Sequence, residues 1–302
     1  MTKPNLFIVG APKCGTTAWV EYLSSHPDIF FSPIKEPHHF NYDMPKYRWV
    51  EDRDDYLKLF SGSGGRKVVA EASVFYLYSE AAAEHIHAFN PDAKLLILVR
   101  DQEDYLPSLH NQIVANGDEI ITDFEEAWRL SGKRNRENVG HFCREIKILD
   151  YRRLGEFTEQ VERYFAVFPR EQIRVVHFSQ WTADPRTTYR EILRFLDLPD
   201  DGRTEFPPVN EAWHRPLNWL TPLIRQPPDL AVRAANLFKQ LTGIRRLGLT
   251  NAALRLNSRP GSRTRVSDEL RQEIRDTYET DRRLLQKYLS APVAPAHDPS
   301  LA

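Results

Sequence analysis

The chain has 302 residues, of which 41% are hydrophobic and 27% are charged, a composition typical of a globular protein with a large core. Lysine plus arginine (41) nearly balance aspartate plus glutamate (42), so no overall field favours nucleic acid or an anionic membrane, and any attraction for anions must be local. Cys14 and Cys143 are the only cysteines, which excludes a disulfide framework and favours a reducing compartment.

Strand and helix patterns alternate along the chain. A first strand at 6–9 is followed by a glycine-containing loop and a helix over 17–25. Further strands are predicted at 30–31, 67–70, 94–99 and 173–178, and further helices at 79–89, 101–115, 155–168, after Asp184-Pro185 and at 268–289. This alternation indicates an α/β fold with a central parallel sheet covered by helices on both faces.

The sequence predicts a single domain over 1–302, because it has no Gly/Ser-rich linker, internal repeat or low-complexity tract. Residues 230–267 break the strand and helix rhythm. Residues 205–266 are predicted to be a variable helical insertion, and 291–302 a disordered tail. The apolar run at 6–9 is too short for a signal-peptide core or a membrane span. We therefore expect a soluble, cytoplasmic protein.

Residues 230–267 form the one strongly basic stretch of the sequence, because they contain no Asp or Glu. Their basic residues are Arg233, Lys239, Arg245, Arg246, Arg255, Arg259, Arg263 and Arg265. Three interpretations stay open: a helical hairpin with solvated or paired arginines, a site for an anionic cofactor, or a contact with lipid headgroups.

Residues 10–17 (GAPKCGTT) lie between the first strand and the first helix, where backbone N–H groups and the positive helix end can hold a phosphate. The segment is close to the nucleotide-binding pattern G-x-x-x-x-G-K-[ST], with Gly10, Gly15 and Thr17 at the matching positions. Thr16 replaces the lysine of that pattern, and Lys13 lies inside the loop instead. The pattern therefore favours an anion site but argues against a plain ATPase.

The segment from Pro12 to Thr17 resembles the 5'-phosphosulfate loop of the P-loop sulfotransferase superfamily, in its bacterial and heparan-sulfotransferase-like branch. The resemblance implies an α/β, P-loop-type three-layer fold with a central parallel sheet flanked by helices. It also implies 3'-phosphoadenosine 5'-phosphosulfate (PAPS) as co-substrate and no metal ion. The donor-binding loop would comprise Pro12, Lys13, Cys14, Gly15, Thr16 and Thr17.

A second motif of that superfamily binds the donor's 3'-phosphate through an Arg that follows a buried strand and a Ser in the next helix. KLLILV, Arg100 and Asp101, followed by Ser108, resemble it. An Arg at the carboxyl end of a parallel strand lies where such folds bind ligands. Gln102 stands where the superfamily has Pro, and Tyr105 where it usually has a second Arg, which predicts weaker phosphate binding. The alternative is that Arg100 pairs with a nearby carboxylate.

The sequence SPIKEPHHF, which follows the second strand, resembles the K-E-P-x-F-F or E-x-H-F-F stretch of relatives in the superfamily. The resemblance implies that Glu36 is the general base and that His38 supports it. Lys13 would stabilise charge on the bridging oxygen of the leaving nucleotide, and Lys35 would add positive charge near the transferring group. The alternatives are a solvated loop lysine for Lys13 and a plain surface turn for Glu36.

Two further segments resemble the superfamily. Residues 71–78 (EASVFYLY) match a segment in which the acid and the serine approach the site; Glu71 would orient a lysine, bind the acceptor, or only cap a turn. Near the C-terminus, Arg263 is the candidate for a basic loop that closes over the nucleotide, with Arg259 and Arg265 as alternatives.

The resemblance implies a sulfotransferase that transfers a sulfuryl group from PAPS to a hydroxyl or amine of a small-molecule, lipid or glycan acceptor by direct in-line displacement. Residues 205–266 would shape the acceptor site. Two alternatives stay open: a P-loop nucleotide kinase or phosphotransferase, and a non-catalytic protein that binds anions or a membrane surface through 230–267. No nucleic-acid partner is expected, and the sequence does not indicate an oligomeric state.

Overall fold

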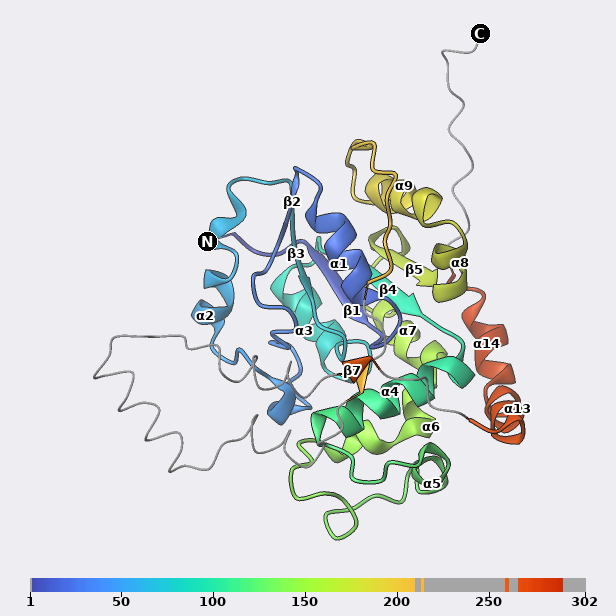
Figure 1. The fold of residues 1–302 in the computed structure, drawn as a ribbon. Coiled ribbons are helices and arrows are strands. Elements are labelled where there is room, and N and C mark those ends of the chain that lie inside the picture. The colour runs from blue at the N-terminus through green and yellow to red at the C-terminus, as the bar shows by residue number, and fades with distance from the viewer. Residues whose placement is uncertain (1, 210–212, 215–258, 261–265, 290–302) are drawn as a thin grey trace. The chain divides into compact units, whose positions relative to one another are not determined.

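The structure is a computed structural model of the chain, and it describes residues 2–209, 213–214, 259–260 and 266–289 (Figure 1). The predicted insertion at 205–266 and the basic stretch at 230–267 lie mostly outside the described residues, and the tail at 291–302 lies wholly outside them. What the sequence indicates for these segments stays a prediction.

The contacts of the chain group into two compact units. The first comprises Met1–Tyr105, Leu154–Val209 and Arg271–Ala302, and the second comprises Leu106–Arg153 and Asn210–Leu270. The chain first passes from one unit to the other within helix α4 (Gln102–Asn116). The single-domain organisation stays a prediction.

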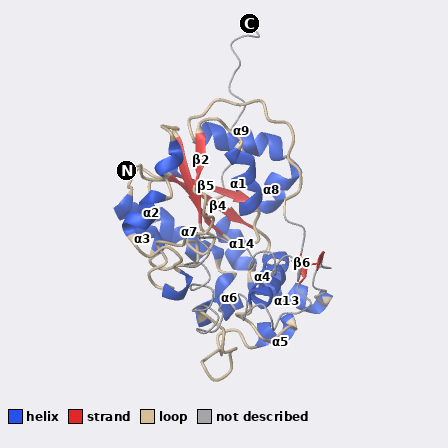
Figure 2. Ribbon diagram, turned by 60° about the vertical axis from the view of Figure 1, so that its left-hand side comes forward, coloured by secondary structure: helices blue, strands red, loops and turns tan. Residues whose placement is uncertain are grey.

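A five-stranded parallel sheet forms the centre of the first unit, as the sequence predicts (Figures 1 and 2). Its strands, in the order β2-β3-β1-β4-β5 across the sheet, are β1 (Leu6–Gly10), β2 (Ile29–Phe31), β3 (Val68–Ala72), β4 (Lys94–Val99) and β5 (Ile173–His177). Every residue of β1 and β3 is buried. Such continuous burial is typical of parallel strands covered on both faces.

Helices flank this sheet, and those that precede β5 in the chain lie in the connections between its strands (Figure 2). They are α1 (Thr16–Ser24), α2 (Arg53–Lys58), α3 (Ala82–Phe89), α7 (Phe157–Phe165), α8 (Phe178–Ala183), α9 (Pro185–Phe195), α13 (Asp268–Thr277), which starts in the second unit, and α14 (Glu279–Leu285). Helix α3 packs on α7, and α7 packs on α14. The predicted alternation is confirmed, with shifts of a few residues at the element ends.

Helix α9 shows how local sequence sets an element's bounds. The Asp184 carboxylate accepts a hydrogen bond from the backbone N–H of Thr187 at 2.9 Å, and proline occupies the first helical position. Both features favour a helix start. Tyr189, Ile192 and Leu193 are buried on one face of the helix. The apolar face predicted from the sequence is therefore the face that is buried.

The predicted single helix over 268–289 is wrong, because the segment forms two helices, α13 and α14, with a break at Tyr278. The Tyr278 ring lies against Gly155, where an added Cβ would be 2.4 Å from the ring carbon Cζ. Asp281, just after the break, accepts a hydrogen bond from Gln102 Nε2 at 3.0 Å. Tertiary packing therefore overrides the helix propensity of this segment.

In the second unit, the described secondary structure includes most of α4, α5 (Phe124–Arg129), most of α6 (Tyr151–Leu154) and the antiparallel pair β6 (Trp213–His214) and β7 (Arg259–Pro260). His110 lies within 6 Å of both Phe124 and Tyr151 in an aromatic cluster, with ring centroids 5.4 and 5.6 Å away. Burial lowers the pKa of His110 to about 4, so the ring is neutral at physiological pH.

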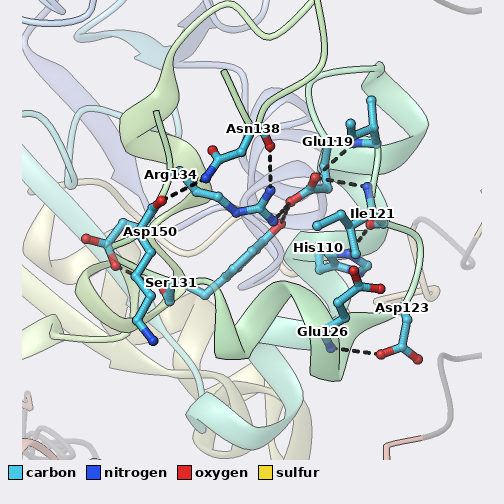
Figure 3. A network of polar contacts seen from close by, with 12 residues as sticks. His110, Glu119, Ile121, Asp123, Glu126, Ser131, Arg134, Asn138 and Asp150 are labelled. Carbon is cyan, nitrogen blue, oxygen red and sulfur yellow. Dashed lines mark hydrogen bonds and ion pairs between the residues drawn. The ribbon is translucent and has the colours of Figure 1, made fainter. Parts of the chain in front are cut away.

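A buried ion pair joins the loops of this unit (Figure 3). Glu119 Oε2 accepts a hydrogen bond from Arg134 Nη2 at 2.6 Å, and both side chains are almost fully buried, with 0% and 2% exposed. The other carboxylate oxygen accepts the N–H groups of Ile120 and Ile121 at 2.9 and 3.0 Å. The Tyr151 hydroxyl donates to Oε2 at 3.3 Å. Glu119 therefore holds together segments that are separate in the sequence.

Replacing Arg134 by Ala should lower the free energy of unfolding by about 3–5 kcal/mol, because the Glu119 carboxylate would stay buried without its counter-ion. Arg129→Ala is the matched control, since Arg129 forms a surface pair with Glu125, the two side chains being 51% and 49% exposed. That change should cost at most about 0.5 kcal/mol. Urea unfolding of both variants measures the difference, and equal midpoints would contradict the role given to the pair.

Candidate active site

The loop between β1 and α1 packs against an indole ring. Gly15, the last residue of the loop, has a φ of 93°, a conformation that favours glycine. A Cβ added to Gly15 would lie 2.4 Å from Cζ2 of Trp181, a residue of α8. Glycine is therefore required at this position for its backbone conformation and for the close approach to Trp181.

Helix α1 presents its positive end to this loop. The helix has no side-chain cap and no acidic residue in its first turn. Its first N–H groups and its dipole therefore favour a bound anion. The side chains of Cys14 and Thr16 are buried, at 0% and 3% exposure. Thr16 can therefore serve an anion mainly through its backbone N–H group, whereas the Cys14 N–H donates to the Ala11 carbonyl at 3.4 Å.

Lys13 and Arg100 lie next to each other, although they come from the two separate motifs. Arg100 Nη1 donates a hydrogen bond to the Lys13 carbonyl at 3.4 Å. The Arg100 guanidinium also lies 4.5 Å from the ring centroid of Phe178, the first residue of α8. Burial lowers the pKa of Lys13, and the positive charges of Arg100 and Lys35 lower it further. Three cations therefore meet at one end of α1.

Arg100 is incompletely paired within the described residues. Its Nε is buried without a hydrogen-bond partner there. Its Nη2 lies 3.7 Å from Asp104 Oδ2, a long ion pair, and Asp104 also pairs with Arg271 at 3.1 Å. Because a buried donor without an acceptor is costly, Arg100 retains capacity for an anionic ligand.

Glu36 lies beside this group of cations. Its Oε1 is 3.2 Å from Lys35 Nζ, and its Oε2 is 3.6 Å from His38 Nε2. The same Lys35 ammonium donates a hydrogen bond to Thr17 Oγ1 at 2.5 Å. The Asn41 amide, 3.3 Å away, donates to His38 Nδ1, which leaves the ring proton on Nε2, facing Glu36. The predicted base, its supporting histidine and the phosphate loop are thus brought together.

The backbone around Glu36 is held in an uncommon conformation. Glu36 and His38 have φ values of 60° and 49°, which are unfavourable for residues with a Cβ. Two bonds to the end of β3 hold the segment: Glu36 N–H donates to the Ala72 carbonyl at 2.9 Å, and His38 N–H to Ser73 Oγ at 3.0 Å. These two bonds therefore hold the backbone of Glu36 in place despite its unfavourable conformation.

The surroundings keep the Glu36 carboxylate ionised. Burial acts to raise the pKa of Glu36, but the polar contact with His38 and the positive charge of Lys35 outweigh it and lower the pKa to about 2. A carboxylate of this kind can accept a proton, but only weakly while both partners stay in place.

Comparison with known proteins decides the family. A family model described as "Sulfotransferase domain" matches residues 3–206. The chain belongs to the sulfotransferase family. It is also similar to a crystal structure of a sulfotransferase from Alicyclobacillus acidocaldarius, with 31% sequence identity, 83% of this chain and 100% of that chain covered, and a TM-score of 0.61. The resemblance stated from the motifs and the P-loop-type α/β fold are therefore confirmed.

Two curated sulfotransferases illustrate the relationship at lower identity. The chain is 24% identical over 245 residues to carbohydrate sulfotransferase 15 of Rattus norvegicus, and 26% identical over 196 residues to heparan sulfate glucosamine 3-O-sulfotransferase 5 of Homo sapiens. These matches cover 65% of this chain but only 44% and 54% of the two relatives. The chain thus spans about half the length of these curated relatives.

The two residues that depart from the usual sulfotransferase motif around Arg100, Tyr105 and Gln102, are both buried. Tyr105 is 1% exposed and packs on Phe157 with ring centroids 4.9 Å apart, so it lies in the core. Gln102 is buried and donates to the Gly155 carbonyl at 3.1 Å. Ser108 lies on α4 in the second unit, and its predicted part in donor binding stays a prediction.

The remaining predictions concern the basic loop near the C-terminus, metal binding and membrane association. Arg263 and Arg265 lie outside the described residues, and Arg259 belongs to β7. Over the described ranges, no group of three or more His, Cys, Asp or Glu side chains could hold a metal ion. None of the described helices has the length and apolar character needed to cross a membrane.

Glu71 is a core residue, which favours none of the three roles considered from the sequence. Its side chain on β3 is 0% exposed, and neither carboxylate oxygen has a hydrogen-bond partner among the described residues. Burial raises the pKa of Glu71 to about 8, although the hydroxyls of Tyr76 and Tyr56 act to lower it without forming well-directed hydrogen bonds. The group is therefore largely protonated at neutral pH.

Glu71→Gln should make the protein less sensitive to alkaline pH. Because the pKa of Glu71 rises from 4.5 to about 8 on folding, its stabilising contribution is complete below pH 4.5 and is lost as the pH rises through 8. The full loss is about 5 kcal/mol. Melting temperatures from pH 5 to 9 should fall less steeply for the variant than for the wild type.

Glu84→Gln serves as the control, since Glu84 is exposed on α3. Its melting temperature should follow the wild type across the same pH range. Parallel curves for Glu71→Gln and the wild type would show that Glu71 does not titrate in this range.

Proposed function

We propose that this sulfotransferase uses PAPS as donor and transfers its sulfuryl group to a hydroxyl or amine by direct in-line displacement. The observation that carries the proposal is the meeting of Lys13, Lys35 and Arg100 at the positive end of α1, beside an ionised Glu36. Three cations next to one carboxylate suit a donor with several negative charges and a nearby base.

The residues present fit such a donor. The loop N–H groups and Lys13 would hold the 5'-phosphosulfate, since α1 lacks a cap of its own. Arg100 would hold the second phosphate, because its buried Nε lacks a partner among the described residues. Arg100 lies in hydrogen-bond contact with the Lys13 carbonyl, which supports one ligand bound by both motifs.

This arrangement supports removal of a proton from the acceptor together with stabilisation of the negative charge that develops on the leaving group. PAPS supplies an activated sulfuryl group whose leaving group is 3'-phosphoadenosine 5'-phosphate. Glu36 would accept the proton of the acceptor hydroxyl or amine as that atom attacks sulfur. Lys13 would stabilise the charge that develops on the leaving oxygen, and Lys35 the charge on the transferred group.

A glycan hydroxyl is the acceptor class to test first. The names of the two curated relatives specify carbohydrate and heparan sulfate glucosamine, and this chain shares the family with them. Small-molecule and lipid acceptors are the other classes, since one fold serves many acceptors. A cytoplasmic location remains part of the proposal.

Donor binding is tested with 3'-phosphoadenosine 5'-phosphate, which lacks only the sulfuryl group. At about 100 times its dissociation constant it should stabilise the wild type by about 2.7 kcal/mol. Lys13→Ala and Arg100→Ala should each weaken binding about tenfold or more, because a charge-assisted contact is lost. Calorimetric titration measures the affinities.

Lys67→Ala is the control, since the Lys67 side chain is 65% exposed. It should bind the nucleotide as the wild type does. ATP with magnesium should bind more weakly than the bisphosphate. The reverse order would favour a nucleotide kinase, and wild-type affinity in both site variants would contradict the two-motif donor site.

Glu36→Gln should lower kcat about a hundredfold or more with the donor affinity preserved, because the amide cannot accept the proton. The assay follows transfer of radiolabelled sulfate from PAPS to unsulfated heparan oligosaccharides. Glu51→Gln, which changes an exposed carboxylate nearby in the sequence, should keep wild-type turnover. Equal turnover of Glu36→Gln and the wild type would remove the base role from Glu36.

A further inference from the structure

Lys35 connects the phosphate loop with the candidate base. Its ammonium donates a hydrogen bond to Thr17 Oγ1 at 2.5 Å and lies 3.2 Å from Glu36 Oε1. Thr17 is in the first turn of α1, at the end where an anion is favoured. A single side chain therefore contacts both the expected donor position and the residue that would take the acceptor's proton.

His38 and Lys35 both contact the Glu36 carboxylate, and their side chains differ in how freely they can move. His38 is 1% exposed, with Asn41 on Nδ1 and Ser73 on its backbone N–H. The Lys35 side chain is 35% exposed and extends on a flexible four-carbon stem. Lys35 is therefore the partner of Glu36 that can move without disturbing the core.

The charges around Lys35 decide where its ammonium is most stable. Glu36 attracts it with a single negative charge at 3.2 Å, and Lys13 repels it from the loop. Among the described residues, Glu36 also faces His38 on its own segment, the positive charge of Lys13 from the loop and, from β3, the uncharged Ala72 carbonyl. A dianionic group on the loop would attract Lys35 more strongly than Glu36 does and would cancel the repulsion from Lys13.

We propose that Lys35 makes the base available only when the donor is bound: its ammonium pairs with Glu36 in the free enzyme and shifts to the donor's anionic oxygens beside Thr17. The proposal rests on the function proposed above. In the free enzyme Lys35 occupies Glu36 Oε1, the atom that an acceptor hydroxyl would need. After the shift this oxygen is free to accept, so the donor binds first and the acceptor second.

The shift also adjusts the strength of the base. An opposite charge at this distance lowers a carboxyl pKa by about 1–3 units. Withdrawal of Lys35 therefore raises the pKa of Glu36 from its value of about 2 toward the ordinary range, and proton acceptance becomes easier when the sulfuryl group is in place. His38 keeps its contact and maintains the direction of the carboxylate.

The experiment measures nucleotide affinity and the titration of Glu36 in the same samples. Carbon-13 NMR of protein labelled at glutamate carboxyls follows Glu36, assigned by its absence in Glu36→Gln, with and without 3'-phosphoadenosine 5'-phosphate. In the wild type the nucleotide should raise the pKa of Glu36 by about 1–3 units. Lys35→Met should bind the nucleotide about tenfold more weakly. In Lys35→Met without nucleotide, the pKa of Glu36 should already have the raised value. Adding the nucleotide should not change it further.

Two matched variants complete the design. Lys35→Arg keeps the positive charge and should keep the response of Glu36 to the nucleotide. Lys67→Met makes the same chemical change at an exposed lysine and should behave as the wild type in both measurements. A lost response in Lys67→Met would overturn the assignment to Lys35.

The outcomes separate this proposal from the donor assignment. Tight nucleotide binding with an unchanged Glu36 titration in the wild type would overturn the shift of Lys35 and leave the donor site standing. An unaltered Glu36 response in Lys35→Met would overturn it as well. Failure of the wild type to bind the nucleotide would overturn the donor assignment and the proposal that rests on it.

Discussion

The structure depends on keeping three cations close together at the end of one helix. Lys13, Lys35 and Arg100 repel one another, and burial adds a desolvation cost that lowers the pKa of Lys13. A close-packed core supports this group, since every residue of β1, the strand that leads into the loop, is buried. An anion that binds here removes this repulsion, so the relief of repulsion contributes to the free energy of binding.

Parallel strand order explains how residues from distant parts of the sequence meet there. β1 lies between β3 and β4, and the register pairs Ile8 with Ala72 and Gly10 with Ile97, so the strands end close to the same level. The turn after β1 supplies Lys13, the residue after β4 is Arg100, and the end of β3 anchors the segment of Glu36. Such an edge is where open α/β sheets bind ligands.

The sequence predicted what is encoded locally. Buried strands, the glycine-containing turn and the order of the motifs follow from short-range patterns. The structure brings Lys13, Glu36, His38 and Arg100 near one another, and their roles stay predictions. Contacts between distant segments were not predictable in the same way. Trp181 lies against Gly15 from more than 160 residues away in the chain, and no motif marks it. The break at Tyr278 arises from packing on Gly155, which helical periodicity cannot show.

Two of the three cations have a carboxylate partner close to them in the sequence, and this arrangement reconciles the donor site with the stability of the free protein. Lys35 pairs with Glu36 at 3.2 Å and Arg100 with Asp104 at 3.7 Å. Asp104 has a second cation in Arg271, so it remains paired if Arg100 turns to a phosphate. Glu36 keeps His38, whose Nε2 lies 3.6 Å from its Oε2. Neither carboxylate is left without a partner when its cation is withdrawn, so an anionic ligand can displace both pairs at low cost.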